Sequence, residues 1–343
     1  MGLTRTRRVG RTELHLPVLG IGTCPLSGVY APVTEAEAAA TLAEAWESGL
    51  RLFDTAPWYG LGQGEHRTGR ALYQHPRESY SLTTKVGRVL RAPRDRAAFR
   101  PPAWAAALAF EPHHLFTYDA ILRSYEDSLQ RLGINRVDTL YIHDLDTGYF
   151  PDPAQLSAKL AELESGGFRA LEELKRSGEI KAIGAGINER GMIARFLERA
   201  DLDVFLVASR YTLLEHEIYR DEIRQAAARG ASVVVGGVFN SGILATGGGD
   251  GAKYDYGTAP VPVRERVRQL ERVAEAHGVA LPAAALQFPL AAPEVTSVVF
   301  GAVTPEEVRR NVTHFLAPIP QAFWSDLRAE GLVHPEVPTP QGA

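Results

Sequence analysis

The chain has 343 residues, of which 45% are hydrophobic and 23% charged, and its formal net charge is -4 at pH 7. This composition supports a large buried core and differs from that of disordered or membrane chains. The acidic balance argues against nucleic acid or an anionic membrane as the main partner. No apolar run follows the basic opening, so we expect no signal peptide and a cytoplasmic location. With Cys24 as the single cysteine, no internal disulfide is possible, which suits that compartment.

In chain order, strand-like and helix-like segments alternate from end to end. A hairpin is predicted over 7–18, a buried strand over 19–25, and a helix over 34–48 that a capping box of Thr34 and Glu37 begins. Further strands are predicted over 51–56, 81–86, 137–143, 180–187, 204–211, 232–238 and 296–301. Further helices are predicted over 65–73, 119–132, 167–177, 191–199, 216–229, 263–277 and 305–313. About eight βα units without a linker favour one domain over 1–343, a (β/α)8 barrel with an N-terminal hairpin.

Three long segments interrupt this alternation, at about 87–117, 144–165 and 240–262. Loops of this length inside a compact domain are usually functional. The glycines of the third segment suggest mobility, since no P-loop lysine follows them. An open Rossmann-type sheet is the alternative fold, but Gly20 and Gly22 lack the third glycine of its dinucleotide-binding motif.

Polar side chains stand at the ends of three successive predicted strands: Asp54, Lys85 and His143. Tyr59 follows Asp54 closely, beyond Pro57, which ends the strand. Neighbouring strand ends meet at the C-terminal mouth of a barrel, so these four side chains are expected to share one pocket. A phenol is a candidate proton carrier if a cation lowers its pKa, and we expect Lys85 to do so while Asp54 orients the ammonium. A neutral His143 would donate a hydrogen bond to a substrate oxygen.

The chain resembles the aldo-keto reductase family over nearly its whole length. The matching motifs are Leu-Phe-Asp-Thr-Ala-x-x-Tyr-Gly at 52–60, Thr-Lys-Val-Gly at 84–87, Asp-Ser-Leu-x-Arg-Leu-Gly at 127–133 and Tyr-Ile-His-Asp at 141–144. The resemblance implies a (β/α)8 barrel that binds a nicotinamide dinucleotide without a Rossmann motif. It also implies that Tyr59 is the acid/base of a catalytic tetrad that Asp54, Lys85 and His143 complete, without a metal.

The same resemblance suggests cofactor contacts at Asn188, Gly301, Glu307 and Asn311. Relatives that prefer NADP have a lysine and an arginine at the positions of Gly301 and Glu307, so we expect NAD rather than NADP. The other reading of Glu307 is that it only stabilises the first turn of its helix. Where many members have a tyrosine that stacks on the nicotinamide, this chain has Gly236 and Gly237, and Phe239 is a weak candidate to replace it.

Within the family, the chain looks like the branch of NAD-dependent aldose 1-dehydrogenases and pyridoxal 4-dehydrogenases, which oxidise a cyclic hemiacetal to a lactone. Trp58, Phe116 and Tyr118 are expected at the substrate pocket. We favour an aldose of the L-fucose, D-arabinose or L-galactose type, with pyridoxal second and a general aldehyde or ketone third. A cofactor-sensing or interaction subunit with little turnover is the alternative outside catalysis. The sequence leaves the oligomeric state open.

Overall fold

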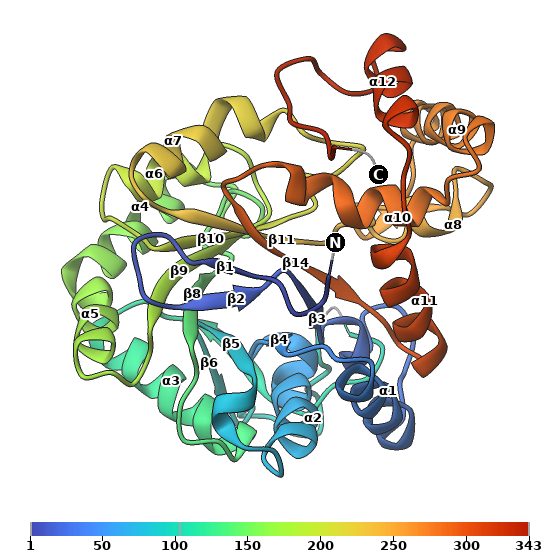
Figure 1. Cartoon of the computed structure of the whole chain (residues 1–343). Coiled ribbons are helices and arrows are strands. Elements are labelled where there is room, and N and C mark those ends of the chain that lie inside the picture. The colour runs from blue at the N-terminus through green and yellow to red at the C-terminus, as the bar shows by residue number, and fades with distance from the viewer. Residues whose placement is uncertain (1, 103, 342–343) are drawn as a thin grey trace.

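Eight parallel strands close into a barrel in this computed structural model, which describes residues 2–102 and 104–341. Around the ring, the strands follow the order β10, β11, β14, β3, β4, β5, β8 and β9 (Figure 1). They are β3 (Leu19–Gly22), β4 (Leu52–Asp54), β5 (Ser81–Val86), β8 (Thr139–His143), β9 (Ala182–Ile187), β10 (Val204–Ala208), β11 (Ser232–Gly236) and β14 (Val295–Gly301). The (β/α)8 prediction is confirmed, and the open sheet is excluded because β14 pairs with β3 and closes the ring.

The predicted hairpin is present as β1 (Thr6–Arg8) and β2 (His15–Pro17), and it lies across the N-terminal opening of the ring (Figure 1). Its apolar side chains Val9, Leu14 and Leu16 join the cluster that fills the barrel interior, together with Tyr141 and Leu206 from the strands. The Arg7 guanidinium fixes the hairpin by donating to the carbonyl oxygens of Ala292 at 3.0 Å and Leu290 at 2.8 Å. The N-terminal end is thus plugged, and the chain's polar strand ends gather at the other end.

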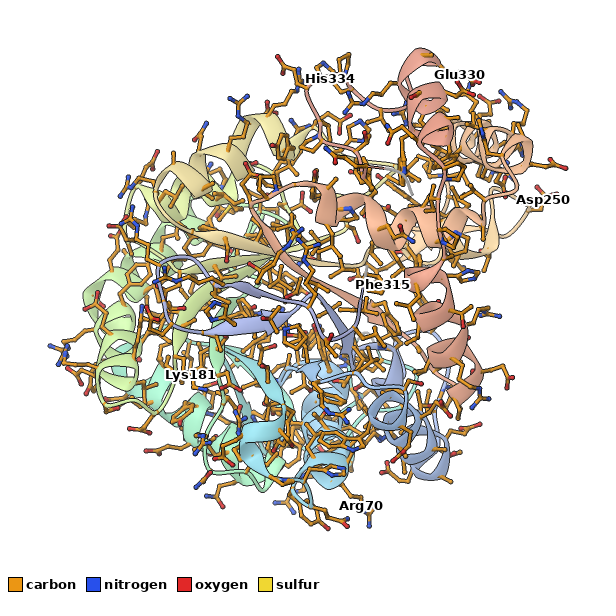
Figure 2. The ribbon with its side chains drawn as sticks, in the orientation of Figure 1. Arg70, Lys181, Asp250, Phe315, Glu330 and His334 are labelled. Atoms are coloured by element: carbon orange, nitrogen blue, oxygen red, sulfur yellow. The ribbon has the colours of Figure 1, made fainter. Side chains whose placement is uncertain are left out.

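Helices surround the strands and bury their apolar faces in one large outer core. They include α1 (Glu35–Glu47), α2 (Gln63–Leu72), α3 (Tyr118–Leu132), α5 (Phe168–Arg176), α6 (Met192–Leu197), α7 (Arg224–Ala228), α9 (Val261–Ala276), α10 (Leu281–Gln287), α11 (Pro305–Leu316) and α12 (Gln321–Ala329). The capping box predicted for α1 is present, with Thr34 and Glu37 bonding reciprocally. Charged side chains such as Arg70 and Asp250 lie at the periphery, whereas Phe315 is buried (Figure 2).

The three long segments contain more regular structure than the sequence analysis predicted. The first holds the hairpin of β6 (Arg88–Arg91) and β7 (Glu111–His114), and the second holds α4 (Pro153–Glu162). The third holds α8 (Ile243–Thr246) and the short hairpin of β12 (Lys253–Tyr254) and β13 (Gly257–Thr258). The sequence did signal α4, since Asp152 caps it and proline occupies its first position. Among the described residues, no helix combines the length and apolar character needed to cross a membrane.

Candidate active site

Backbone strain is concentrated at the C-terminal mouth of the barrel. Non-glycine residues with positive φ follow β4, β8, β10 and β11 or lie in the β12–β13 turn; they are Leu61, Asp144, Ser209, Asn240, Ser241, Asp255 and Tyr256. Such conformations cost about 1 to 3 kcal/mol each and persist where the surroundings enforce them, often at functional sites. The strain therefore points to the same end of the barrel as the polar strand ends.

Asp54 and Lys85 form a buried ion pair at the ends of β4 and β5. Lys85 Nζ donates to Asp54 Oδ2 at 2.7 Å and to the Thr55 carbonyl oxygen at 2.8 Å. Thr83 Oγ1 donates to the other carboxylate oxygen at 2.7 Å. The two side chains are 5% and 1% exposed, so each charge depends on the other for compensation. The pair holds a charged ammonium in a fixed position at the mouth.

Tyr59 lies beside this pair, at the start of a 3-10 turn (Tyr59–Gly62) that follows β4. Lys85 Nζ is 4.9 Å from the centre of its ring, and the His143 ring meets it edge-on with centres 5.9 Å apart. Burial raises the pKa of Tyr59 well above its usual value, and the carboxylates of Asp54 and Asp144 raise it further. Our expectation that Lys85 lowers this pKa is therefore wrong for this structure, because Asp54 already compensates the ammonium charge. Tyr59 is held as a neutral phenol, which is a proton donor.

His143 ends β8 and is buried between charged neighbours. Burial lowers its pKa well below the usual histidine value, and the positive charges of Arg88 and Lys85 lower it further. Its imidazole is therefore neutral near pH 7. The Nε2 atom lies 3.3 Å from Asp144 Oδ2. A neutral imidazole in this position is able to donate a hydrogen bond to a bound oxygen, in agreement with the expectation from the sequence.

Two charged residues of this site, Arg88 and Asp144, were missed by the sequence analysis. Arg88 Nη2 donates to Asp144 Oδ2 at 2.7 Å, and Asn188 Nδ2 donates to Asp144 Oδ1 at 2.7 Å. Both partners of this ion pair have side chains no more than 6% exposed, and burial raises the pKa of Asp144. Their positions in the sequence could have indicated them, since Asp144 directly follows His143 and Arg88 comes three residues after Lys85.

Of the three residues expected at the substrate pocket, Trp58 alone lies beside the charged residues of the mouth. Its ring lies 4.3 Å from the Arg88 guanidinium carbon and meets the Trp104 ring edge-on at 5.5 Å. Phe116 is fully buried in the outer core, where it packs so close to Gly87 that a Cβ there would lie 2.3 Å from its ring. Tyr118 begins α3, and its hydroxyl group donates a hydrogen bond to Glu173 on α5. The expectations for Phe116 and Tyr118 are wrong because their segment turns outward to the helices after β7.

The residues expected to bind the cofactor have structural partners of their own. Asn188 follows β9 and bonds to Asp144, while a Cβ at Gly301 would lie 2.5 Å from Pro25 Cγ, so packing explains this glycine. Glu307 Oε2 accepts from the Val303 N–H at 2.8 Å, and its own N–H donates to Thr304 Oγ1. Asn311 is buried one turn further along α11. Cofactor contacts by these residues remain predictions.

The nicotinamide ring expected from the sequence would lie near the end of β11, where Gly236 carries no side chain. A Cβ added at Gly236 would meet its nearest neighbour at 3.4 Å, which is ordinary contact. Asn240, shortly after β11, has a buried Oδ1 without a hydrogen-bond partner among the described residues. Phe239 is partly buried against the outer core. A strand end without a side chain, near an amide oxygen that lacks a partner among the described residues, fits a carboxamide-bearing ring.

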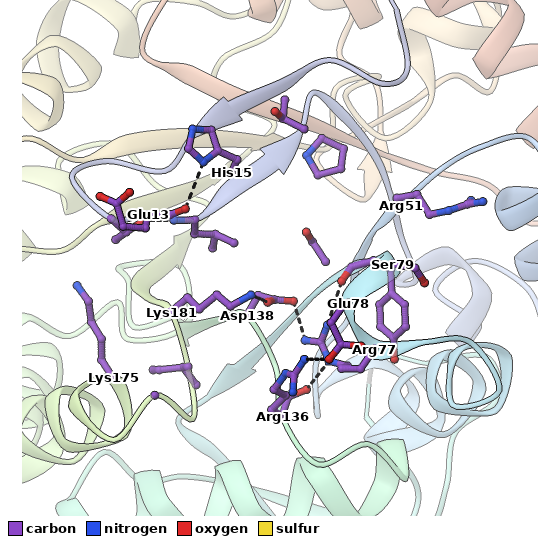
Figure 3. A pocket seen from close by; sticks show the side chains of 18 residues that line it. Glu13, His15, Arg51, Arg77, Glu78, Ser79, Arg136, Asp138, Lys175 and Lys181 are labelled. Carbon is purple, nitrogen blue, oxygen red and sulfur yellow. Dashed lines mark hydrogen bonds and ion pairs between the residues drawn. The ribbon is translucent and has the colours of Figure 1, made fainter.

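A cavity of about 770 Å³ lies at the opposite, N-terminal end of the barrel, beside the hairpin (Figure 3). Charged side chains line it, and several of them form ion pairs with one another. Arg77 and Lys181 bond to Asp138 at 2.6 Å and 2.8 Å, and Arg136 bonds to Glu78 at 2.5 Å. None of Asp54, Tyr59, Lys85 and His143 lines this cavity, and we place the candidate active site at the mouth.

One prediction concerns His114, which accepts a bond from Arg88 Nε at 3.0 Å. Burial lowers the pKa of His114 to about 4 in the folded chain. Between the usual histidine pKa and pH 4, His114 is therefore protonated in the unfolded chain but not in the folded one. Its stabilising contribution is thus complete above the usual histidine pKa and falls as the pH falls towards 4. Between pH 7.5 and 5, the wild type should lose about 1 to 2 kcal/mol more stability than His114→Gln. Urea unfolding at both pH values checks this, and equal losses would contradict it.

The sequence and the fold were compared with those of known proteins. A model described as the aldo/keto reductase family matches residues 18–330. The chain is 42% identical over 336 residues to a pyridoxal 4-dehydrogenase of Microbacterium luteolum, covering 95% of this chain and 97% of that protein. It is 36% identical over 335 residues to a D-threo-aldose 1-dehydrogenase of a Pseudomonas species, covering 95% and 96%. An aldo-keto reductase structure from Bacillus halodurans superposes with a TM-score of 0.72 over 97% of both chains at 24% identity, which supports the fold.

Proposed function

The chain belongs to the aldo/keto reductase family, an oxidoreductase family, and from this premise we propose that it is an NAD-dependent dehydrogenase that oxidises a cyclic hemiacetal to a lactone. The observation that supports this most is the meeting of the Asp54–Lys85 pair, Tyr59 and a neutral His143 at one mouth. The two relatives described above carry the names of dehydrogenases, which favours oxidation as the direction.

In the proposed reaction, His143 donates a hydrogen bond to the hemiacetal hydroxyl oxygen and fixes it beside Tyr59. Tyr59, as the phenolate, takes the proton of this hydroxyl group. The C–H bond of the hemiacetal carbon breaks at the same time, and a C=O bond forms between that carbon and the oxygen. Bound NAD would accept the hydride at its nicotinamide ring. Because Tyr59 is neutral in this structure, the phenolate fraction and the oxidation rate should rise with pH.

Within this class, we place pyridoxal ahead of the aldoses, which reverses the order favoured by the sequence alone. The supporting observations are the identity to the two relatives, 42% against 36%, and the aromatic rings of Trp58 and Tyr149 beside Arg88. A planar ring packs well against the face or the edge of an aromatic side chain. The aldoses remain the second candidate, because the second relative is named for them.

For the cofactor, we propose NAD over NADP. Glu307 holds a carboxylate at the start of α11, and no side chain fits at Gly301 without moving Pro25. A carboxylate near the adenosine ribose repels a 2'-phosphate and is able to accept bonds from free hydroxyls.

The test is a screen for NADH or NADPH formation at mildly alkaline pH, with pyridoxal, aldoses and simple alcohols as substrates. We expect turnover of a cyclic hemiacetal, with kcat/KM at least about tenfold higher for NAD, and a smaller preference in Glu307→Gln, which keeps the bond to Val303. Turnover of simple alcohols alone would contradict the substrate class. A preference for NADP would contradict the cofactor assignment.

A further inference from the structure

Arg88 occupies an unusual place for a guanidinium group. It begins β6, directly after Gly87, whose φ of +101° turns the chain at the end of β5. Its side chain is 1% exposed, and its guanidinium carbon lies 4.3 Å from the Trp58 ring centre and 4.4 Å from the Tyr149 ring centre, the two rings standing at 89° to each other. Contact with two aromatic rings restricts the position of the guanidinium group.

Two of its three nitrogen atoms have hydrogen-bond partners, and the third has none of good geometry, although the side chain also interacts with Tyr149. Nε donates to His114 Nε2 at 3.0 Å, and Nη2 donates to Asp144 Oδ2 at 2.7 Å. Nη1 is buried and lacks a hydrogen-bond partner within residues 2–102 and 104–341. Leaving a charged donor buried and unpaired is costly, so such a group usually has a ligand to bind.

The position of Nη1 relates it to the reacting centre. Asp144 Oδ2, which binds Arg88 at 2.7 Å, is also 3.3 Å from His143 Nε2. Arg88 and His143 therefore flank the same carboxylate oxygen, and the positive charge of Arg88 contributes to the low pKa of His143. If His143 binds the reacting oxygen, as the proposed function requires, Arg88 lies one carboxylate group away from it. Trp104 Nε1 is a second buried donor without a described partner, on the ring that meets Trp58 edge-on.

We propose that Arg88 is a specificity-determining residue, whose Nη1 donates a hydrogen bond to a substrate oxygen adjacent to the oxidised hemiacetal group. This inference rests on the proposed function and names the feature that its substrate must carry. In pyridoxal that oxygen is the ring phenolate, and in an aldose it is the 2-hydroxyl group. A guanidinium group binds an anionic oxygen more strongly than a neutral one, so the phenolate is the better match.

The test combines a change in the enzyme with a change in the substrate. For whichever substrate class is turned over, kcat and KM are measured with the intact compound and with an analogue that lacks this oxygen, 3-deoxypyridoxal or a 2-deoxyaldose. In the wild type, we expect removal of the oxygen to lower kcat/KM by about 10- to 100-fold. In Arg88→Met the same removal should lower kcat/KM by less than about threefold, and in Arg88→Lys by an intermediate factor. Arg91→Met, an exposed arginine of the same strand, is the control and should keep the wild-type ratio.

The outcomes separate this inference from the proposed function. If no cyclic hemiacetal is oxidised, the proposed function fails. If one is oxidised and the wild type uses the analogue equally well, the role of Arg88 fails alone, and this comparison needs no variant to fold. If removing the oxygen lowers kcat/KM by the same factor in the wild type and in Arg88→Met, the inference is also overturned. Loss of a purely structural arginine would lower kcat/KM equally for the intact compound and the analogue.

Discussion

Replacing Tyr59 by phenylalanine is expected to lower kcat/KM by about 10²- to 10⁴-fold while the affinity for NAD stays unchanged. The substitution removes only the hydroxyl group that we propose as the proton carrier. The ring remains, and with it the edge contacts to His143 and Trp104. Steady-state kinetics measures kcat/KM. Titration with NAD, followed by the quenching of the protein's tryptophan fluorescence, measures the affinity.

Tyr141→Phe is the matched control, because Lys85 Nζ lies 5.8 Å from the Tyr141 ring centre as well. Tyr141 fills the barrel interior rather than the mouth, so activity should change by no more than a few-fold. The pH profile gives a second check, since the rise in oxidation rate with pH should disappear in Tyr59→Phe. Turnover near the wild-type level in Tyr59→Phe would contradict the role of Tyr59 as the proton carrier. NAD binding with little turnover in both the wild type and the variant would support a subunit without this chemistry.

Replacing Lys85 by methionine is expected to abolish activity and to lower the free energy of unfolding by about 3 to 5 kcal/mol. The stability effect arises because Asp54 would remain buried without a counter-charge. In the double variant Asp54→Asn/Lys85→Met, most of the stability should return, since neither charge is then left unpaired. Activity should stay lost, because the mouth would lack its ammonium group.

Guanidinium chloride unfolding of the wild type, both single variants and the double variant measures this coupling. Additive losses in the double variant would mean that the 2.7 Å contact contributes little in solution. Recovery of both stability and activity would show that the ion pair is structural alone.

The sequence predicted the barrel and the meeting of Asp54, Tyr59, Lys85 and His143 because strand ends are strongly marked. Apolar runs locate the strands, and closure of the ring brings neighbouring ends together, so the residue types at those ends determine the site. The direction of a side chain in a loop has no such marker. Trp58 and Phe116 are both aromatic residues near strand ends, yet one lines the mouth and the other packs in the outer core.

Charge compensation was also beyond the reach of sequence reasoning. The effect of Lys85 on Tyr59 depends on where Asp54 lies, and the 2.7 Å bond between lysine and aspartate leaves burial as the dominant influence on the phenol. Similarly, Gly301 was interpreted through the cofactor, whereas its contact with Pro25 gives it a packing role. Each of these facts concerns contacts between segments far apart in the chain.

Transfer of deuterium from a substrate labelled at the hemiacetal carbon tests the central claim most directly. The enzyme is incubated with NAD and the labelled compound, and both products are analysed by NMR and mass spectrometry. We predict one deuterium at C4 of the nicotinamide ring for each molecule of lactone formed. NADH without deuterium, or deuterium released to the solvent, would contradict direct hydride transfer at this mouth.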